Sequence, residues 1–182
     1  VFAHAGERVL LIDADLRKPR LHSIFDFPRS PGLTDAEDGD FESYVSQSSV
    51  EGLSVLTCGT RIGNPSEFLH LWSKQIVDSI KERFVRVIID SPPVNAVADP
   101  AILARAVDGV LFVVSANTAS RDGVTSALES LHTVNAPLVG TVINNLRNDT
   151  GGYYSYYRDN YGYRGYYGEE ANGKTCSKEW QE

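Results

Sequence analysis

The sequence contains no methionine, only two cysteines, and no apolar run of the length that crosses a membrane. A membrane-spanning helix needs about 20 mostly apolar residues, so we expect none within this stretch. Cys58 and Cys176 are too few for a disulfide framework, and neither has histidines nearby at the spacing of a metal site. A reducing cytosol is therefore the simplest compartment for this part of the protein.

An excess of positive charge is also missing. The chain carries 17 Lys and Arg against 24 Asp and Glu, which is a formal net charge of −7. Binding to nucleic acid usually shows as a basic patch or stripe, so we expect no nucleic-acid partner. With 42% hydrophobic and 23% charged residues, the composition is that of an ordinary globular domain.

The third absence is a phosphate-binding loop of the form Gly-x-x-x-x-Gly-Lys-Ser/Thr. Residues 59–63, Gly-Thr-Arg-Ile-Gly, are not followed by the required lysine. Such a loop normally opens the first helix of the domain, and residues 3–6 look like a helix end with Gly6 as its cap. We therefore expect a strand, the loop and most of a helix to precede Val1 in a longer reading frame.

The pattern that is present alternates apolar strands with amphipathic helices. Five short runs rich in Val and Ile are typical of strands buried on both faces of a parallel sheet. They cover residues 9–12, 53–56, 85–89, 110–114 and 138–143. This alternation predicts a doubly wound, mostly parallel α/β sheet.

Three helices are expected between the later strands. The first begins at Asn64-Pro-Ser-Glu67, where Asn64 can cap the helix and Glu67 can close a capping box. Its apolar face is formed by Phe68, Leu69, Trp72, Ile76 and Ile80. The others cover residues 99–107 and 123–134, and residues 26–50 form a polar connection with a short helix near 42–45.

Two of the expected strands end in carboxylates. Asp13 and Asp15 follow the first strand, and Asp90 ends the third in the sequence Val-Ile-Ile-Asp-Ser-Pro-Pro. Ligands of open α/β sheets bind beyond the carboxyl ends of the strands, and an Asp in the second pattern holds the Mg²⁺ of a nucleotide in Walker B elements. Each acid alone could cap a turn, but two at one sheet edge favour a metal–nucleotide site. Asn144, which ends the last strand, either binds an adenine edge or forms a turn.

Aliphatic residues almost cease after Leu146, and eight of the nine tyrosines fall within fifteen residues. They are Tyr153, Tyr154, Tyr156, Tyr157, Tyr161, Tyr163, Tyr166 and Tyr167. Such a segment cannot bury enough apolar surface to offset its ordering entropy, so we expect a domain over residues 1–146 and a flexible tail over 147–182. The tyrosines form either a sticky aromatic–glycine segment or a row of phosphate acceptors.

These motifs together resemble the bacterial tyrosine autokinases that regulate capsule and exopolysaccharide synthesis and export. The resemblance rests on Asp-Ala-Asp-Leu-Arg-Lys-Pro at 13–19, Asn-Pro-Ser-Glu-Phe-Leu at 64–69, Asp-Ser-Pro-Pro at 90–93, Gly-x-Val-x-Asn at 140–144, and the tyrosine cluster. It implies a P-loop fold of the MinD-like, deviant Walker type. It also implies an ATP- and Mg²⁺-dependent protein-tyrosine kinase, which the present residues alone are expected not to complete.

The resemblance further implies residue roles. Asp13 looks like the acid that accepts the proton of the attacking hydroxyl, and Asp15 and Asp90 look like the magnesium ligands. Arg17 either contacts phosphate or pairs with Asp13, and Asn144 matches the adenine contact. The tail tyrosines are then phosphorylated between neighbouring subunits of a ring. The family works with a membrane-embedded polysaccharide chain-length regulator, fused or separate, which places the kinase in the cytoplasm at the inner face of the membrane.

Two other interpretations are open. A MinD-, ParA- or Mrp-like ATPase shares the Asp13 and Asp90 elements and hydrolyses ATP without a protein acceptor. Division-site members of that group end in a basic amphipathic helix, whereas this chain has Tyr and Gly in its tail. The third interpretation is a catalytically incompetent scaffold whose tail binds partners.

Overall fold

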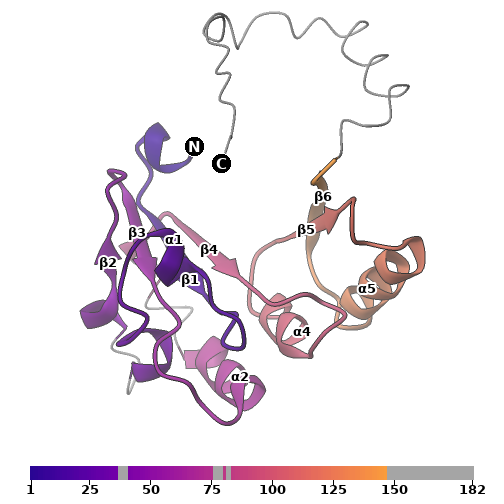
Figure 1. Cartoon of the computed structure of the whole chain (residues 1–182), viewed down its shortest axis with the longest axis horizontal. Helices are drawn as coiled ribbons and strands as arrows, with labels where there is room; N and C mark the ends of the chain where they lie inside the picture. Colours follow the sequence, from indigo (N-terminus) through magenta and orange to yellow (C-terminus); the bar gives the residue numbers. More distant parts are fainter. Residues whose placement is uncertain (37–40, 76–79, 81–82, 147–182) are drawn as a thin grey trace, which may run out of the picture. The chain divides into compact units, whose positions relative to one another are not determined.

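The computed structural model describes residues 1–36, 41–75, 80 and 83–146 (Figure 1). The chain divides into two units, Val1–Asn144 and Asn145–Glu182, and the described helices and strands all belong to the first. The predicted tail, with Cys176 and the eight clustered tyrosines, lies outside the described residues.

The described strands form two sheets. The strands are β1 (Val9–Asp13), β2 (Ser46–Gln47), β3 (Leu53–Leu56), β4 (Arg86–Asp90), β5 (Val110–Ser115) and β6 (Leu138–Asn144). The first sheet has the order β2-β3-β1-β4, in which only β2 is antiparallel, and β5 pairs with β6 in parallel. All five predicted runs are strands with bounds within one residue of the prediction, and the mostly parallel α/β class is confirmed.

The prediction that the strands are buried on both faces is right for only part of the sheet. In β1 and β3, Leu10, Ile12 and Leu56 are fully buried, whereas Leu111 and Val113 of β5 are more than half exposed. Within the described part of the chain, β4 pairs only with β1 and β5 only with β6. The exposed side chains of β5 therefore have the predicted apolar pattern without a described element that covers them.

Four helices and three 3-10 turns connect the strands. The helices are α1 (Leu21–Ile24), α2 (Pro65–Gln75), α4 (Asp99–Ala104) and α5 (Arg121–Thr133), and the turns are Ala3–Ala5, Leu33–Asp35 and Glu42–Tyr44. The prediction for α4 extended three residues too far, to Val107, and α5 begins two residues before Gly123 because the Ser120 hydroxyl accepts the Gly123 N–H at 3.1 Å. Gly6 caps the first turn in the left-handed region, at φ 85°, as its position predicts.

The predicted cap of α2 is present with one difference. The Asn64 side-chain oxygen accepts the backbone N–H of Glu67 at 3.4 Å, and its amide donates to the Glu67 carboxylate at 2.8 Å. A capping box would instead join the carboxylate to the backbone N–H of the cap residue. The predicted apolar position Ile76 lies outside the described residues.

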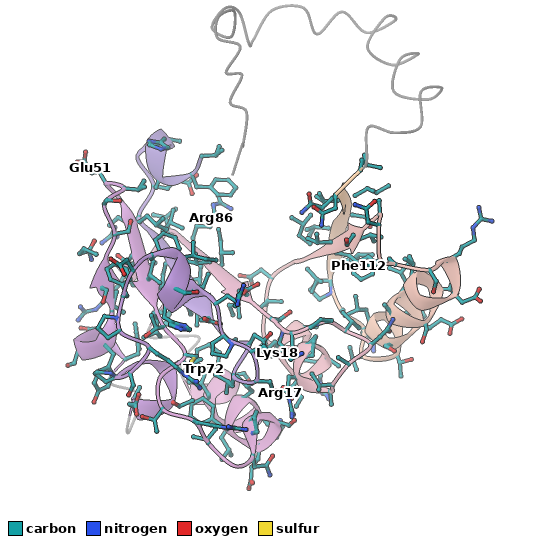
Figure 2. The ribbon with its side chains drawn as sticks, in the orientation of Figure 1. Arg17, Lys18, Glu51, Trp72, Arg86 and Phe112 are labelled. Carbon is teal, nitrogen blue, oxygen red and sulfur yellow. The ribbon has the colours of Figure 1, made fainter. Side chains whose placement is uncertain are left out.

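Side chains of α2 and the first sheet enclose the main hydrophobic core, which includes Trp72 (Figure 2). Residues 26–50, predicted only as a polar connection, contribute Leu33 and Phe41 to this core at 0% and 1% exposure. These two residues were missed because isolated apolar residues have no periodicity. A second cluster packs α5 on β5 through Phe112, Ala127 and Leu131.

The carboxylate of Asp35 holds the connection between β1 and β3 against the end of β3. Its Oδ2 accepts the backbone N–H groups of Gly32 at 2.8 Å and Thr60 at 3.0 Å, and the hydroxyl of Ser30 at 3.2 Å. Burial alone would raise the pKa of Asp35, but these hydrogen bonds outweigh it and hold the pKa below its usual value.

We expect Asp35→Asn to lower the free energy of unfolding by about 1 kcal/mol at pH 7, since hydrogen bonds to a charged acceptor are lost from a partly exposed site. A depressed folded-state pKa contributes stability above the unfolded pKa of about 3.9 and loses it as pH falls through the folded value. Urea unfolding at pH 7 and at pH 3 should therefore show the difference shrinking in acid. An equal difference at both values, or the same behaviour in the exposed Asp122→Asn control, would contradict this assignment.

Candidate active site

Asp13 is the last residue of β1, and its side chain is fully buried. Its Oδ2 accepts the backbone N–H groups of Arg20 at 3.0 Å and of Leu21 at 2.9 Å, where α1 begins. Its Oδ1 is buried without a hydrogen-bond partner. Because an unpartnered buried carboxylate oxygen is costly, this atom is suited to receive a cation or a proton donor.

Asp90 ends β4 directly beside Asp13. The two residues are partners in the parallel register of β1 and β4, and the N–H of Ala14 donates to the Asp90 carbonyl at 2.9 Å. The expectation that both acids lie at one sheet edge is confirmed. The geometry follows from parallel pairing, which brings the carboxyl ends of neighbouring strands together.

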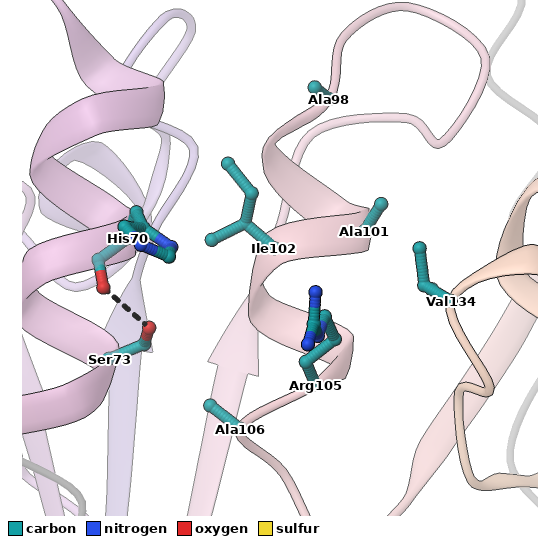
Figure 3. A pocket seen from close by; sticks show the side chains of 8 residues that line it. All are labelled: His70, Ser73, Ala98, Ala101, Ile102, Arg105, Ala106 and Val134. Atoms are coloured by element: carbon teal, nitrogen blue, oxygen red, sulfur yellow. Dashed lines mark hydrogen bonds between the residues drawn. The ribbon is translucent and has the colours of Figure 1, made fainter.

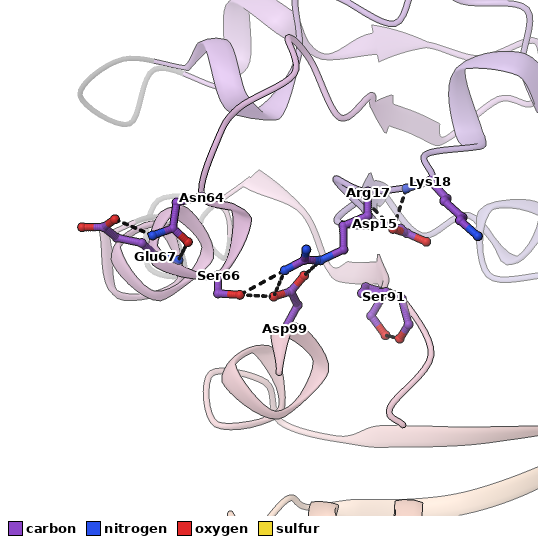
Figure 4. Close-up of polar contacts among 9 residues, drawn as sticks. Asp15, Arg17, Lys18, Asn64, Ser66, Glu67, Ser91 and Asp99 are labelled. Atoms are coloured by element: carbon purple, nitrogen blue, oxygen red, sulfur yellow. Dashed lines mark hydrogen bonds and ion pairs between the residues drawn. The ribbon is translucent and has the colours of Figure 1, made fainter. Parts of the chain in front are cut away.

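Asp15 is held by the turn that follows β1. Its Oδ1 accepts the backbone N–H groups of Arg17 at 3.2 Å and Lys18 at 2.9 Å (Figure 4). This is the local hydrogen bonding that Asp offers to its own following backbone. The other carboxylate oxygen is not part of that turn, so Asp15 can serve the turn and a ligand together.

The three acids raise one another's cost of ionisation. Burial raises the pKa of Asp13, and the charge of Asp15 adds to it, while the backbone hydrogen bonds from Leu21 and Arg20 offset only part of the increase. Burial likewise raises the pKa of Asp90, and the charges of Asp13 and Asp15 raise it further. A bound cation would relieve this repulsion and favour the ionised forms.

A magnesium ion fits this donor set when a nucleotide is present. In the residues that the structure describes, no group of three His, Cys, Asp or Glu side chains is arranged to hold a metal alone. Mg²⁺ keeps several waters and takes one or two carboxylates together with phosphate oxygens. Two acids at a strand edge and an unpartnered carboxylate oxygen meet that requirement.

Arg17 pairs with Asp99, so the interpretation that it pairs with Asp13 is wrong. Its Nε donates to Asp99 Oδ2 at 2.9 Å and its Nη2 to Asp99 Oδ1 at 3.4 Å. The hydrogen-bonded oxygen of Asp13 is already occupied by the backbone N–H groups at the start of α1. The Arg17 side chain is still 40% exposed, so its predicted contact with phosphate stays a prediction.

Asp99 is a polar residue of this region whose role the sequence predicts only as a helix start. Its side chain is fully buried, and it also accepts a hydrogen bond from the Ser66 hydroxyl at the start of α2. Burial alone would raise the pKa of Asp99, but hydrogen bonds from Arg17 and Ser66 and the charge of Arg17 lower it below its usual value. No local pattern distinguishes such a carboxylate from an ordinary helix cap.

Asn144 lies at the end of β6, in the second sheet. It pairs with Ser115 in the register, and its carbonyl accepts the N–H of Ala116 at 2.8 Å. Its proposed contact with adenine is not tested by this arrangement and stays a prediction. The eight tail tyrosines lie outside the described residues.

A cavity of about 510 Å³ opens between α2 and α4 (Figure 3). It is lined by His70, Ser73, Ala98, Ala101, Ile102, Arg105, Ala106 and Val134. None of these is an acid or a predicted site residue, so the chemistry remains at the strand ends. In the described part of the chain, no helix has the length and hydropathy of a membrane span.

Comparison with known proteins identifies the family. No family model matches the chain. The sequence is 37% identical over 166 residues to tyrosine-protein kinase YwqD of Bacillus subtilis, covering 88% of this chain and 70% of that protein. It is 33% identical over 160 residues to CapB of Staphylococcus aureus, covering 86% and 70% respectively. The chain belongs to the bacterial tyrosine-protein kinases.

Solved structures agree with membership of the bacterial tyrosine-protein kinases. The chimerical protein CapA2B2 has a TM-score of 0.75 at 32% identity, covering 80% of this chain and 66% of its own. The kinase domain of Escherichia coli tyrosine kinase ETK has a TM-score of 0.75 at 26% identity, covering 84% and 62%. The cell division ATPase MinD of Pyrococcus furiosus has a TM-score of 0.63 at 18% identity, covering 78% and 61%, and this likeness shows the shared fold alone.

Membership of the tyrosine-protein kinases implies nucleotide binding and favours the kinase interpretation over the MinD-like ATPase. The lengths of the relatives differ widely, since the chain spans 70% of YwqD but only 21% of tyrosine-protein kinase ptk of Acinetobacter johnsonii, at 34% identity over 158 residues. The activity, substrates and partners of the complete protein are therefore matters for proposal.

Proposed function

We propose that this chain carries the metal acids and the acceptor tail of an ATP-dependent protein-tyrosine autokinase. The observation that carries the proposal is the pairing of Asp13 with Asp90 at the ends of adjacent parallel strands, where Asp13 Oδ1 is buried without a partner. A nearby hydroxyl group would find in that oxygen both a hydrogen-bond acceptor and a base. Kinase relatives at 33–37% identity support phosphoryl transfer as the reaction.

The residues have separate roles in the proposed transfer. Asp13 Oδ1 accepts the proton of a tyrosine hydroxyl while that oxygen forms its bond to the γ-phosphorus of ATP and the bond from phosphorus to the β-phosphate oxygen breaks. The products are phosphotyrosine and ADP. Asp15 and Asp90 hold Mg²⁺, which when bound offsets the charge of the β- and γ-phosphates. Arg17 contacts phosphate and Asn144 contacts the adenine edge.

The acceptors in this proposal are the tail tyrosines of a neighbouring subunit in a ring. Residues 1–146 form the nucleotide-binding domain and residues 147–182 the flexible tail, and each added phosphate brings about −1.5 to −2 charges to the tail. A membrane polysaccharide co-polymerase, fused or separate, positions the kinase at the inner face of the cell membrane and links it to exopolysaccharide synthesis. This part of the proposal rests on the family resemblance of the sequence.

The test uses the complete protein that contains this chain, incubated with ATP and Mg²⁺ and probed for phosphotyrosine. We expect Asp90→Ala to lower the signal about 100-fold or more, the scale on which loss of preorganised charge stabilisation lowers kcat. Asp122→Ala removes an exposed acid from the first turn of α5 and should leave the signal unchanged. Strong phosphotyrosine in Asp90→Ala, or ATP hydrolysis without phosphotyrosine in the wild type, would refute the proposal.

A further inference from the structure

We propose that Asp99 is a positioning residue for the metal site, acting through Arg17 on the turn that holds Asp15. The inference rests on the proposed function, because it concerns the carboxylate assigned there to Mg²⁺. It adds to that function a residue that contacts neither metal nor nucleotide. Three segments that are far apart in the sequence meet at its carboxylate: the turn after β1, the start of α2 and the start of α4 (Figure 4).

The Asp99 carboxylate is fully engaged. Oδ2 accepts Arg17 Nε at 2.9 Å, and Oδ1 accepts both Arg17 Nη2 at 3.4 Å and the Ser66 hydroxyl. Arg17 Nη2 also donates to Ser66 Oγ at 3.3 Å. A planar guanidinium held on two oxygens has a defined orientation, unlike a single ion-pair contact. Because the Asp99 side chain is fully buried, water does not compete for these bonds.

The orientation of Arg17 passes to Asp15 through the main chain. The backbone N–H of Arg17 donates to Asp15 Oδ1 at 3.2 Å, and the next N–H, of Lys18, donates to the same oxygen at 2.9 Å. Anchoring the Arg17 side chain therefore anchors the two donors that orient the Asp15 carboxylate. Partners that orient a metal ligand in this way typically change metal affinity or activity 10- to 100-fold when removed.

The charge of Asp99 has a second effect on the same carboxylate. Arg17 is attracted to Asp15 as well as to Asp99. If Asp99 were neutral, the guanidinium would be free to turn toward Asp15 and compete with a cation for it. Both effects predict weaker Mg²⁺ binding in Asp99→Asn, a change that removes charge while preserving size.

The chain offers a matched control at the opposite edge of the same strands. Arg86 donates to Glu7 through Nε at 2.7 Å and through Nη2 at 3.2 Å, which is the same two-point geometry. This pair links the residues that begin β4 and precede β1, away from the strand ends that carry the acids. Glu7→Gln therefore removes an equivalent ion pair without touching the Asp15 turn.

The experiment titrates Mg²⁺ with the complete protein and two measurements: phosphotyrosine formation at fixed ATP, and the Mg²⁺-dependent rise in Tm in the presence of ADP. We expect Asp99→Asn to raise the half-saturating Mg²⁺ concentration about 10-fold in both measurements. Ser66→Ala should shift it in the same direction by a smaller factor, and Glu7→Gln should leave it unchanged. Arg17→Gln combined with Asp99→Asn should shift it no further than Arg17→Gln alone, since the two residues act as one unit.

The outcomes separate this inference from the proposed function. If Asp90→Ala retains phosphotyrosine, the proposed function fails. If Asp90→Ala is silent but Asp99→Asn titrates like the wild type, or its effect adds fully to that of Arg17→Gln, only the role of Asp99 is overturned. Should Asp99→Asn lose its cooperative unfolding transition, Ser66→Ala and Arg17→Gln carry the test, and unchanged Mg²⁺ titrations in both would overturn the inference.

Discussion

Asp13→Asn is expected to lower tyrosine phosphorylation by the complete protein about 1,000-fold, within the range attributed to a positioned general base. Asparagine preserves the size of the side chain and an oxygen that accepts the N–H groups of Arg20 and Leu21. It cannot take up the proton of a tyrosine hydroxyl. The measurement is the initial rate of phosphotyrosine formation at saturating ATP and Mg²⁺.

The same substitution should not destabilise the domain. Burial raises the folded-state pKa of Asp13, so its ionised form opposes folding at neutral pH. We therefore expect the Tm of Asp13→Asn to equal or exceed that of the wild type at pH 7. A large loss of Tm would mean that lost activity reports unfolding and would contradict the catalytic assignment.

Mixing two variants shows where the phosphate goes. Subunits with Asp13→Asn retain the tail tyrosines, whereas subunits with all eight tail tyrosines changed to Phe retain the acids. Neither alone should become strongly labelled, and the mixture should regain phosphotyrosine on the Asp13→Asn subunits. A mixture that stays unlabelled would contradict transfer between subunits.

Gly32→Ala is expected to lower the free energy of unfolding by about 3 kcal/mol, the upper end of overpacking costs in a rigid site. A Cβ at Gly32 would lie 2.4 Å from the Thr57 carbonyl oxygen and 2.6 Å from the Gly59 nitrogen. Both atoms belong to the backbone, so no flexible side chain can move aside. The strand end and the connection it contacts would have to separate, which exposes the buried Leu33.

Gly63→Ala is the control for that substitution. No atom lies within 4 Å of a Cβ at Gly63, so its midpoint in urea should differ from the wild type by the small amount usual for surface changes. Equal midpoints for Gly32→Ala and Gly63→Ala would show that the connection between β1 and β3 is not tightly packed. The same measurement on the combined variant should reproduce the loss seen in Gly32→Ala.

The strands were predictable because each is a short run of Val, Ile and Leu, a pattern that depends only on neighbouring residues. The connection between β1 and β3 was not. Leu33 and Phe41 stand alone among polar residues, yet they are buried in the core. The four-residue helix α1 is too short for its periodicity to be recognised, although its first N–H groups orient Asp13.

The sequence by itself determined the class of fold and the chemistry at the strand ends. Parallel strands finish at a common edge, so Asp13 and Asp90 had to be neighbours once the strand pattern was known. Only the tertiary structure decided that Arg17 pairs with Asp99, 82 residues away. It alone decided also that Asp13 Oδ1 is buried without a partner and that the pKa values of Asp13 and Asp90 are raised. Burial and charge coupling are properties of segments brought together from distant parts of the chain, and no local pattern encodes them.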